Sequence, residues 1–142
     1  MVADEQGSLR PADLAAVPAA VPKALLAGKR VLTTGHENPD ADAIGSALGI
    51  ALALESLGAR SETVFADPVP AMYDFLPGVE RARSALSDDL QPDLIVVCDG
   101  DLERTGAVLR DNAELFGRVP IVNIDHHVSN PGAGAVDWVD AE

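Results

Sequence analysis

The sequence contains little cysteine and few aromatic residues, and each shortage excludes a class of protein. Cys98 is the only cysteine among 142 residues, so no internal disulfide can form, which favours a reducing, cytoplasmic location. Aromatic residues make up 4% of the chain, so alanine, valine, leucine and isoleucine must fill the core. A core of this kind suits parallel strands that are covered by alanine-rich helices.

Basic residues and long apolar runs are also scarce. Ten basic residues against 23 acidic ones give a net charge of −13, which argues against non-specific binding to nucleic acid. No run reaches the ~18 apolar residues of a membrane span, so we expect no membrane partner. Residues 14–28 are apolar, but Pro18 and Pro22 interrupt them. We expect a surface helix there, leading into the first strand.

The remaining chain alternates between strand-like and helix-like segments. Residues 1–12 are predicted to be a flexible terminus, and residues 13–142 to form one domain. We predict strands over 30–34, 61–66, 93–98 and 119–124, a long helix over 41–57, a helical turn over 72–76 and a short helix over 111–116. This order predicts an α/β fold, with a mostly parallel, Rossmann-like sheet flanked by helices.

The first polar cluster follows the strand over 30–34. His36, Asn38, Asp40 and Asp42 lie within seven positions, at the start of the long helix. Aspartate at a helix start is an ordinary N-cap, and capping would explain one of the two acids. It does not explain the histidine, the asparagine and the second aspartate together, so we interpret the cluster as a candidate metal site.

Two further clusters follow the buried strands. Asp99 comes directly after the strand over 93–98, either as a ligand or as a solvated loop residue. Arg104 follows it and is a candidate for binding a substrate phosphate, although pairing with the neighbouring Glu103 is the commoner arrangement. Asp125, His126 and His127 follow the strand over 119–124.

The three clusters should meet at one edge, because ligands bind at the carboxyl ends of parallel strands. All three histidines of the chain lie in these clusters. Carboxylates mixed with imidazole favour Mn²⁺, Mg²⁺ or Zn²⁺, and shared carboxylates suggest a pair of ions that activate water against a phosphate. The residues alone therefore predict a two-metal hydrolase.

The motifs resemble the DHH phosphoesterase superfamily, which includes RecJ-like nucleases. The resemblance runs from about Arg30 to Asp140, through the stretch His36–Ser46, then Asp99, then the Asp125-His126-His127 triplet. It is closest to the NrnA-type branch of oligoribonucleases and pAp phosphatases. It implies that His36 and Asp40 hold one Mn²⁺ ion.

The other roles follow from the same resemblance. Asp42 and His126 would hold a second ion, and Asp99 would bridge the two, with Mg²⁺ as the other candidate metal. The catalytic set would be Asp99, His126, His127 and Asn38. His127 would contact the phosphate or support the site, Asn38 would lie near substrate, and Asp125 would orient a histidine from behind the metal ligands.

Two parts of the family pattern have no counterpart here. The family has a further metal-binding aspartate downstream of the triplet, and Asp137 and Asp140 lie too close to the triplet to supply it. The second, DHHA1-type domain, which carries a basic substrate-binding motif, is also absent. We therefore expect the DHH domain to be incomplete at its C-terminus and the isolated piece to be a candidate for inactivity.

The predicted function is metal-dependent hydrolysis of short oligoribonucleotides, or of 3′-phosphoadenosine 5′-phosphate (pAp), by an enzyme that is a candidate homodimer. Cyclic-dinucleotide hydrolysis is the nearest alternative within the same chemistry, followed by pyrophosphate hydrolysis. A non-catalytic domain that binds metal or nucleotide is the alternative from another class. The simplest alternative is a structural α/β domain whose acids are helix caps and loop residues.

Overall fold

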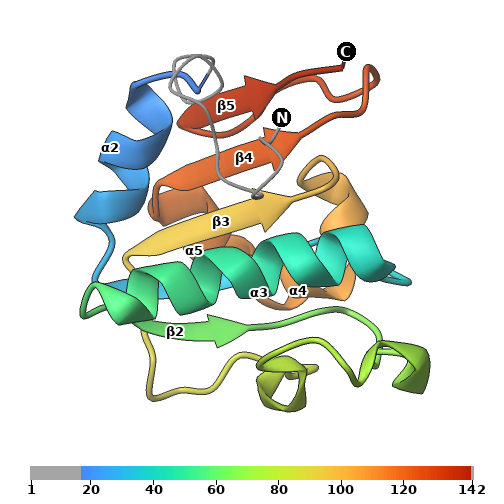
Figure 1. Ribbon diagram of the computed structural model, residues 1–142. Helices are drawn as coiled ribbons and strands as arrows, with labels where there is room; N and C mark the ends of the chain where they lie inside the picture. Colours follow the sequence, from blue (N-terminus) through green and yellow to red (C-terminus); the bar gives the residue numbers. More distant parts are fainter. Residues whose placement is uncertain (1–16, 142) are drawn as a thin grey trace, which may run out of the picture.

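The computed structural model describes residues 17–141, and they form one five-stranded sheet. The strands are β1 (Arg30–Thr34), β2 (Arg60–Thr63), β3 (Leu94–Cys98), β4 (Ile121–Asp125) and β5 (Val136–Val139). Their order is β2-β1-β3-β4-β5 and every neighbouring pair is parallel (Figure 1). The predicted α/β class with a parallel sheet is confirmed.

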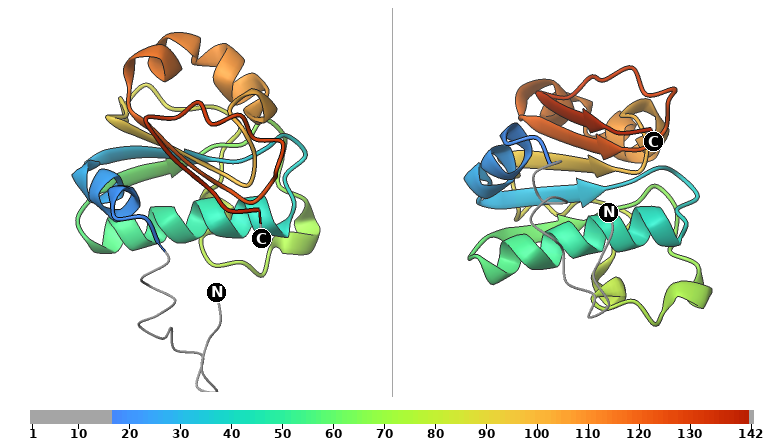
Figure 2. Two further views of the ribbon diagram at one scale, coloured as in Figure 1. Left: turned by 90° about the horizontal axis from the view of Figure 1, so that it is seen from above. Right: turned by 45° about the horizontal axis from the view of Figure 1, so that its top comes forward.

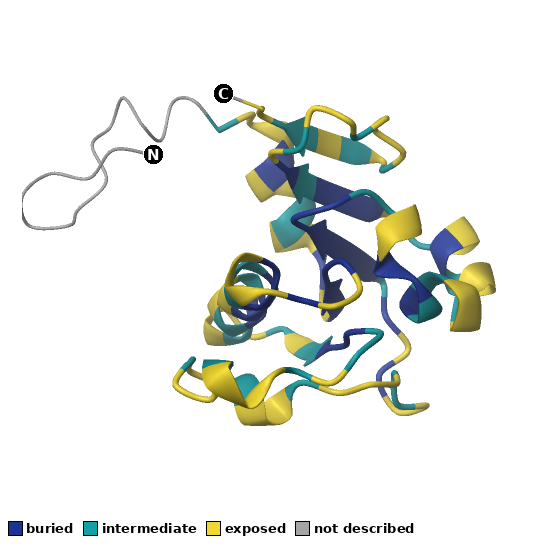
Figure 3. Cartoon of the chain, turned by 90° about the vertical axis from the view of Figure 1, so that its right-hand side faces the viewer, coloured by how far each residue is buried: buried dark blue, intermediate teal, exposed yellow. Residues whose placement is uncertain are grey.

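Helices cover both faces of this sheet. Helices α2 (Ala20–Ala27) and α3 (Ala41–Ser56) pack on one face, and α4 (Ala107–Asp111) and α5 (Ala113–Arg118) pack on the other (Figure 2). Alternate residues of β3 point to opposite faces of the sheet. Val96 packs on the side of α3, whereas Ile95 and Val97 pack on the side of α4 and α5. The central strands are therefore buried on both sides, as their apolar sequences predict (Figure 3).

Helix α3 begins and ends close to where the sequence predicts. Asp40 is its N-cap, and the Oδ1 atom of Asp40 accepts a hydrogen bond from the Ala43 amide at 3.0 Å. The helix ends one residue before Leu57, and Gly58 follows with a φ of 99°. Its buried residues Ile44, Leu48 and Leu54 pack against the sheet and against Phe65. The helix thus carries Asp40 and Asp42 to the end of β1.

The strand predicted over 61–66 is shorter than expected. It spans Arg60–Thr63, in register with Arg30–Thr33 of β1, and the Val64 amide still donates to the Thr33 carbonyl. Val64 forms an isolated bridge with Arg83, and the Phe65 amide donates to the Arg83 carbonyl. The helical turn predicted over 72–76 is a 3₁₀ turn, η1 (Ala71–Tyr73), and a second 3₁₀ turn, η2 (Val79–Arg81), follows it.

The short helix predicted over 111–116 is wrong in its bounds. Helix begins at Ala107, after the 3₁₀ turn η3 (Glu103–Thr105), and it breaks at Asn112 into α4 and α5. The Asn112 side chain donates to the Val108 carbonyl, which is the acceptor that the residue-112 amide would use in a continuous helix. The side chain therefore replaces the backbone bond at the break.

Two further differences concern the last two strands, and one prediction falls on residues that the structure does not describe. The last predicted strand is shifted, so that Asp125 is its final residue rather than the residue after it. Strand β5 was not predicted as a strand. The flexible terminus predicted over 1–12 lies outside the described residues, as does the first part of the apolar stretch over 14–28. Within residues 17–141, no helix is both long enough and apolar enough to span a membrane.

Candidate metal centre

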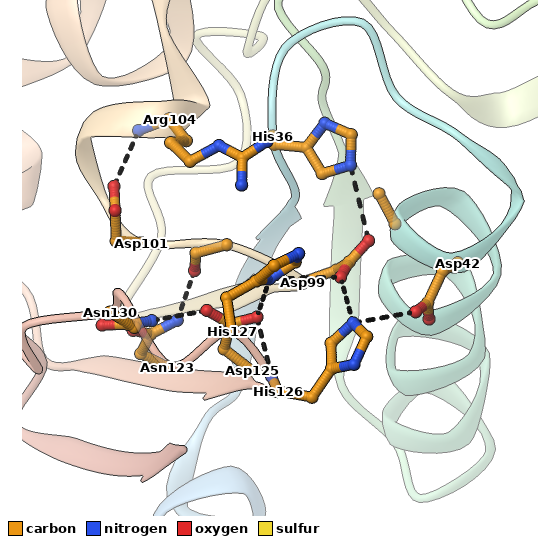
Figure 4. A network of polar contacts seen from close by, with 12 residues as sticks. His36, Asp42, Asp99, Asp101, Arg104, Asn123, Asp125, His126, His127 and Asn130 are labelled. Atoms are coloured by element: carbon orange, nitrogen blue, oxygen red, sulfur yellow. Dashed lines mark hydrogen bonds and ion pairs between the residues drawn. The ribbon is translucent and has the colours of Figure 1, made fainter. Parts of the chain in front are cut away.

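The carboxyl ends of β1, β3 and β4 bring the three polar clusters together. His36 follows β1, Asp42 lies in the first turn of α3, Asp99 follows β3, and His126 follows β4 (Figure 4). Because the three strands are parallel and adjacent, residues 27 or more positions apart contact one another. We define this group, with Asp40, as the rim cluster.

Asp99 lies at the centre of the rim cluster. It is 5% exposed and its backbone has a φ of 58°, a left-handed conformation that only a few non-glycine residues adopt. Its amide donates to the Ile124 carbonyl at 2.9 Å. Burial and the nearby Asp42 charge raise the pKa of the Asp99 carboxyl, against a lowering by its hydrogen bond with His126. A strained backbone and a destabilised buried charge together favour a functional role.

One side of Asp99 faces His36 and Asp40. The Nε2 atom of His36 lies 3.4 Å from Asp99 Oδ2 and 3.6 Å from Asp40 Oδ1. The other ring nitrogen, Nδ1, is 2.7 Å from the Glu37 carbonyl oxygen, which can only accept a hydrogen bond. Nδ1 therefore donates to this carbonyl, and Nε2 is the ring nitrogen that faces the two carboxylates.

The other side of Asp99 faces His126 and Asp42. His126 Nε2 lies 2.9 Å from Asp99 Oδ1 and 3.3 Å from Asp42 Oδ2. The hydrogen bond to Asp99 raises the pKa of the His126 imidazole. Each carboxylate oxygen of Asp99 thus contacts a different histidine. This gives two half-sites that share one residue, an arrangement compatible with the predicted bridging role of Asp99.

Asp125 lies behind the histidines and makes several hydrogen bonds. Its Oδ1 atom accepts from the His126 amide and from His127 Nδ1, each at 2.7 Å. Its Oδ2 atom accepts from Asn130 Nδ2 at 2.8 Å. Burial raises the pKa of the Asp125 carboxyl, but these hydrogen bonds outweigh it, so that the pKa is lowered.

Asp99, Asp125, His126 and His127 also offer donor atoms that lie within 4.8 Å of one another. The side chain of Asp125 is 0% exposed, however, and that of Asp42 is 55% exposed. Asp125 is committed to its internal bonds, so the geometry favours Asp42 as the partner of His126 and a supporting role for Asp125.

Asn38 and Arg104 lie at the rim without joining the cluster. Asn38 has a φ of 50°, and its amide donates to Asp67 Oδ2 at 2.6 Å. The Arg104 amide is bonded to Asp101, whereas its guanidinium makes no ion pair within residues 17–141, so the alternative pairing with Glu103 does not occur. Arg104 is exposed and extends beside His36 (Figure 4).

Sequence reasoning missed three residues that support this site. They are Asp67, which holds the Asn38 turn, and the two asparagines Asn123 and Asn130. Asn123 could have been found from the sequence, because it is the one polar residue inside the apolar run over 119–124. Asp67 and Asn130 had none, since acids and amides are common in loops.

The donor set fits divalent cations. Two imidazole nitrogens and three carboxylates converge, with separations of 2.9–3.6 Å between neighbouring donors. Within the described residues, no lysine or arginine pairs with any of these carboxylates. Burial raises the pKa of the Cys98 thiol to about 12, so the adjacent cysteine offers no thiolate. Nitrogen and oxygen donors with uncompensated negative charge suit Mn²⁺, Mg²⁺ or Zn²⁺.

Comparisons with known proteins agree with this site. Residues 30–140 match the model of the DHH family, N-terminal domain. The bifunctional oligoribonuclease and PAP phosphatase NrnA of Thermus thermophilus is 38% identical over 105 residues, which cover 74% of this chain. The chain spans 30% of that relative's length.

A solved structure has a similar fold. An exopolyphosphatase-related protein from Bacteroides fragilis superposes with a TM-score of 0.71 at 21% identity, over 86% of this chain and 38% of that chain. At this identity the likeness shows the fold alone. The match to the family model covers the whole rim cluster and all five strands.

Proposed function

This chain belongs to the DHH family, and from that membership and the rim cluster we propose that it is part of a metal-dependent phosphoesterase. The observation that carries the proposal is Asp99, whose two carboxylate oxygens each contact a different histidine. His36 and Asp40 would hold one divalent cation, His126 and Asp42 a second, and Asp99 both. Divalent cations in such a site supply hydroxide at neutral pH and stabilise charge on phosphoryl oxygens.

The residues of the chain bind and orient the substrate. His127 presents its Nε2 atom to the phosphate, because Asp125 holds its Nδ1 atom. Arg104 pairs with a non-reacting phosphate, since its guanidinium makes no ion pair with a described residue and lies beside His36. Asn38 contacts the substrate from the turn that Asp67 fixes.

We propose short oligoribonucleotides and pAp as substrates. The support is the 38% identity, over 74% of this chain, to a protein that bears both activities in its name. A net charge of −13 favours substrates with few phosphates over long nucleic acids, which a basic surface would bind. The usual metal of the family, Mn²⁺, belongs to the same proposal, with Mg²⁺ as the alternative.

The test compares the full-length enzyme that contains this chain, as parent, with its Asp99→Asn variant for hydrolysis in the presence of Mn²⁺. The substrates are a short RNA, pAp, a cyclic dinucleotide and pyrophosphate. We expect metal-dependent hydrolysis of the first two by the parent and none by the variant. Equal rates in parent and variant would contradict the proposal. Binding of Mn²⁺ without hydrolysis of any substrate would favour a non-catalytic metal-binding domain.

We also propose a cytoplasmic location and a homodimer. The single, buried cysteine is compatible with a reducing compartment. Light scattering of the purified chain measures its mass directly, and a monomer at every concentration tested would contradict the dimer.

A further inference from the structure

Asn130 links the two halves of the network behind the rim cluster. Its Nδ2 group donates to Asn123 Oδ1 and to Asp125 Oδ2, each at 2.8 Å. Its Oδ1 atom accepts from the Gly132 amide at 2.9 Å, where Gly132 has a φ of 69°. Both hydrogens of the amide and its oxygen are thus committed. The residue cannot be replaced without losing at least one of these bonds.

Asn123, the first residue that Asn130 contacts, is bonded to the backbone around Asp99. Asn123 is 0% exposed, and its Nδ2 group donates to the carbonyls of Val97 at 3.2 Å and Gly100 at 2.8 Å. These two carbonyls lie on either side of Asp99 in the chain, where the backbone takes its left-handed turn. Because Nδ2 faces two acceptors, Oδ1 of Asn123 must be the atom that faces Asn130. The donor in that bond is therefore Asn130.

The Asp125 end of the link lies behind the histidines. The Asp125 carboxylate accepts from Asn130 through one oxygen and from His127 Nδ1 through the other. An ionised carboxylate can only accept, so His127 carries its proton on Nδ1 and exposes the lone pair of Nε2. The bond from Asn130 fixes the plane of the carboxylate, and that plane fixes the direction of the ring.

We propose that Asn130 is a positioning residue: through Asp125 it sets the tautomer and direction of His127, and through Asn123 it steadies the turn that presents Asp99. This rests on the proposed function in so far as His127 is assigned to the substrate phosphate. The simpler alternative is an asparagine that only closes the loop over 126–132. That alternative predicts a change in stability and no change at His127.

The direct test is the ¹⁵N NMR signal of the His127 ring in the metal-free chain, at a pH where the imidazoles are neutral. The chain has three histidines, so His127→Gln identifies the signal. In the parent we expect the Nδ1–H tautomer. Asn130→Ala removes the donor that fixes the plane of the Asp125 carboxylate, so the Nδ1 signal should move towards the unprotonated range.

Asn112→Ala is the matched control, because the Asn112 amide also donates a hydrogen bond within the fold, to the Val108 carbonyl, but lies away from the rim cluster. It should leave the His127 signal unchanged. An Nε2–H tautomer in the parent would overturn the proposal, and so would an unchanged His127 signal in folded Asn130→Ala.

Hydrolysis provides a second measurement. Loss of a residue that supports metal or substrate ligands typically lowers activity about 10- to 100-fold, and we expect this loss in kcat rather than KM for Asn130→Ala. The NMR measurement needs neither metal nor substrate. A moved His127 signal in a chain that hydrolyses nothing would therefore preserve this inference and contradict only the proposed function.

Discussion

The carboxylates at the two ends of the sheet have different partners. At the amino end, Asp93 accepts from the amides of Lys29 and Arg30 at 3.0 and 3.1 Å and faces the Arg30 guanidinium at 3.9 Å. At the carboxyl end, Asp40, Asp42 and Asp99 face histidines, and no arginine or lysine within residues 17–141 pairs with them. A carboxylate whose charge is balanced by amides and an arginine has a structural role. A group of carboxylates without a basic partner is suited to bind cations.

The largest expected effect comes from removing one histidine from a half-site. In calorimetric titrations with Mn²⁺, His36→Gln and His126→Gln should each lose one of two bound ions. Because even supporting residues are worth about 10- to 100-fold in metal affinity, loss of a ligand should exceed about 100-fold at that half-site. Titrations that retain two ions in both variants would disprove the assignment of these histidines.

The matched change at the other end of the sheet is Asp93→Ala. It removes the acceptor of two backbone amides, so the free energy of unfolding should fall by about 1–3 kcal/mol. Urea denaturation measures this fall. Mn²⁺ binding should keep the parent affinity, and a loss of affinity would mean that the two ends are coupled.

The pH dependence of the metal-free chain tests the His126–Asp99 hydrogen bond. That bond raises the pKa of the His126 imidazole above its usual 6.5. The protonated ring therefore stabilises the folded state; this contribution is complete below pH 6.5 and is lost as the pH rises through the raised pKa. Denaturation between pH 6 and pH 9 should show a fall in stability that His126→Gln lacks. An equal fall in both proteins would assign it to another group.

The smallest effect is expected from Arg81→Met. Arg81 forms a two-pronged ion pair with Glu55 near the end of α3, but both side chains are partly exposed. Such pairs contribute about 0.2–1 kcal/mol, so stability should fall by no more than that while Mn²⁺ binding stays constant. A fall of several kcal/mol would show that η2 holds α3 far more firmly than its contacts indicate.

Much of this architecture follows from the sequence, because apolar runs and strand-end polar residues are local signals. Strand β1 matches its prediction, and the start of α3 follows from the capping position of Asp40. The parallel sheet then places His36, Asp99 and His126 at one edge. The DHH resemblance that rests on these residues is confirmed by the family match, whereas the roles of individual residues stay predictions.

The remaining features depend on contacts between distant segments. After β2, Val64 bridges to the distant Arg83, and the break between α4 and α5 is marked by the bond from the Asn112 side chain to Val108. Strand β5 is four residues long, includes the charged Asp137, and gains its identity from pairing with β4. Asn123 stands out as the one polar residue of its apolar run, but Asn130 is of a type common in loops, so only their proximity in the fold shows the link between them.

Thermal unfolding of the parent, Asp99→Asn and Asp93→Ala, each with and without Mn²⁺, tests the central claim most directly. At a hundred times its dissociation constant, Mn²⁺ should stabilise the parent by about 2.7 kcal/mol. At a pH where the His126 ring is neutral, Asp99→Asn should lose this gain without destabilising the metal-free chain, because the buried charge is removed and asparagine tolerates a positive φ. Asp93→Ala should unfold at a lower temperature and keep the gain. A gain that survives in Asp99→Asn, or is missing from the parent, would contradict the metal centre.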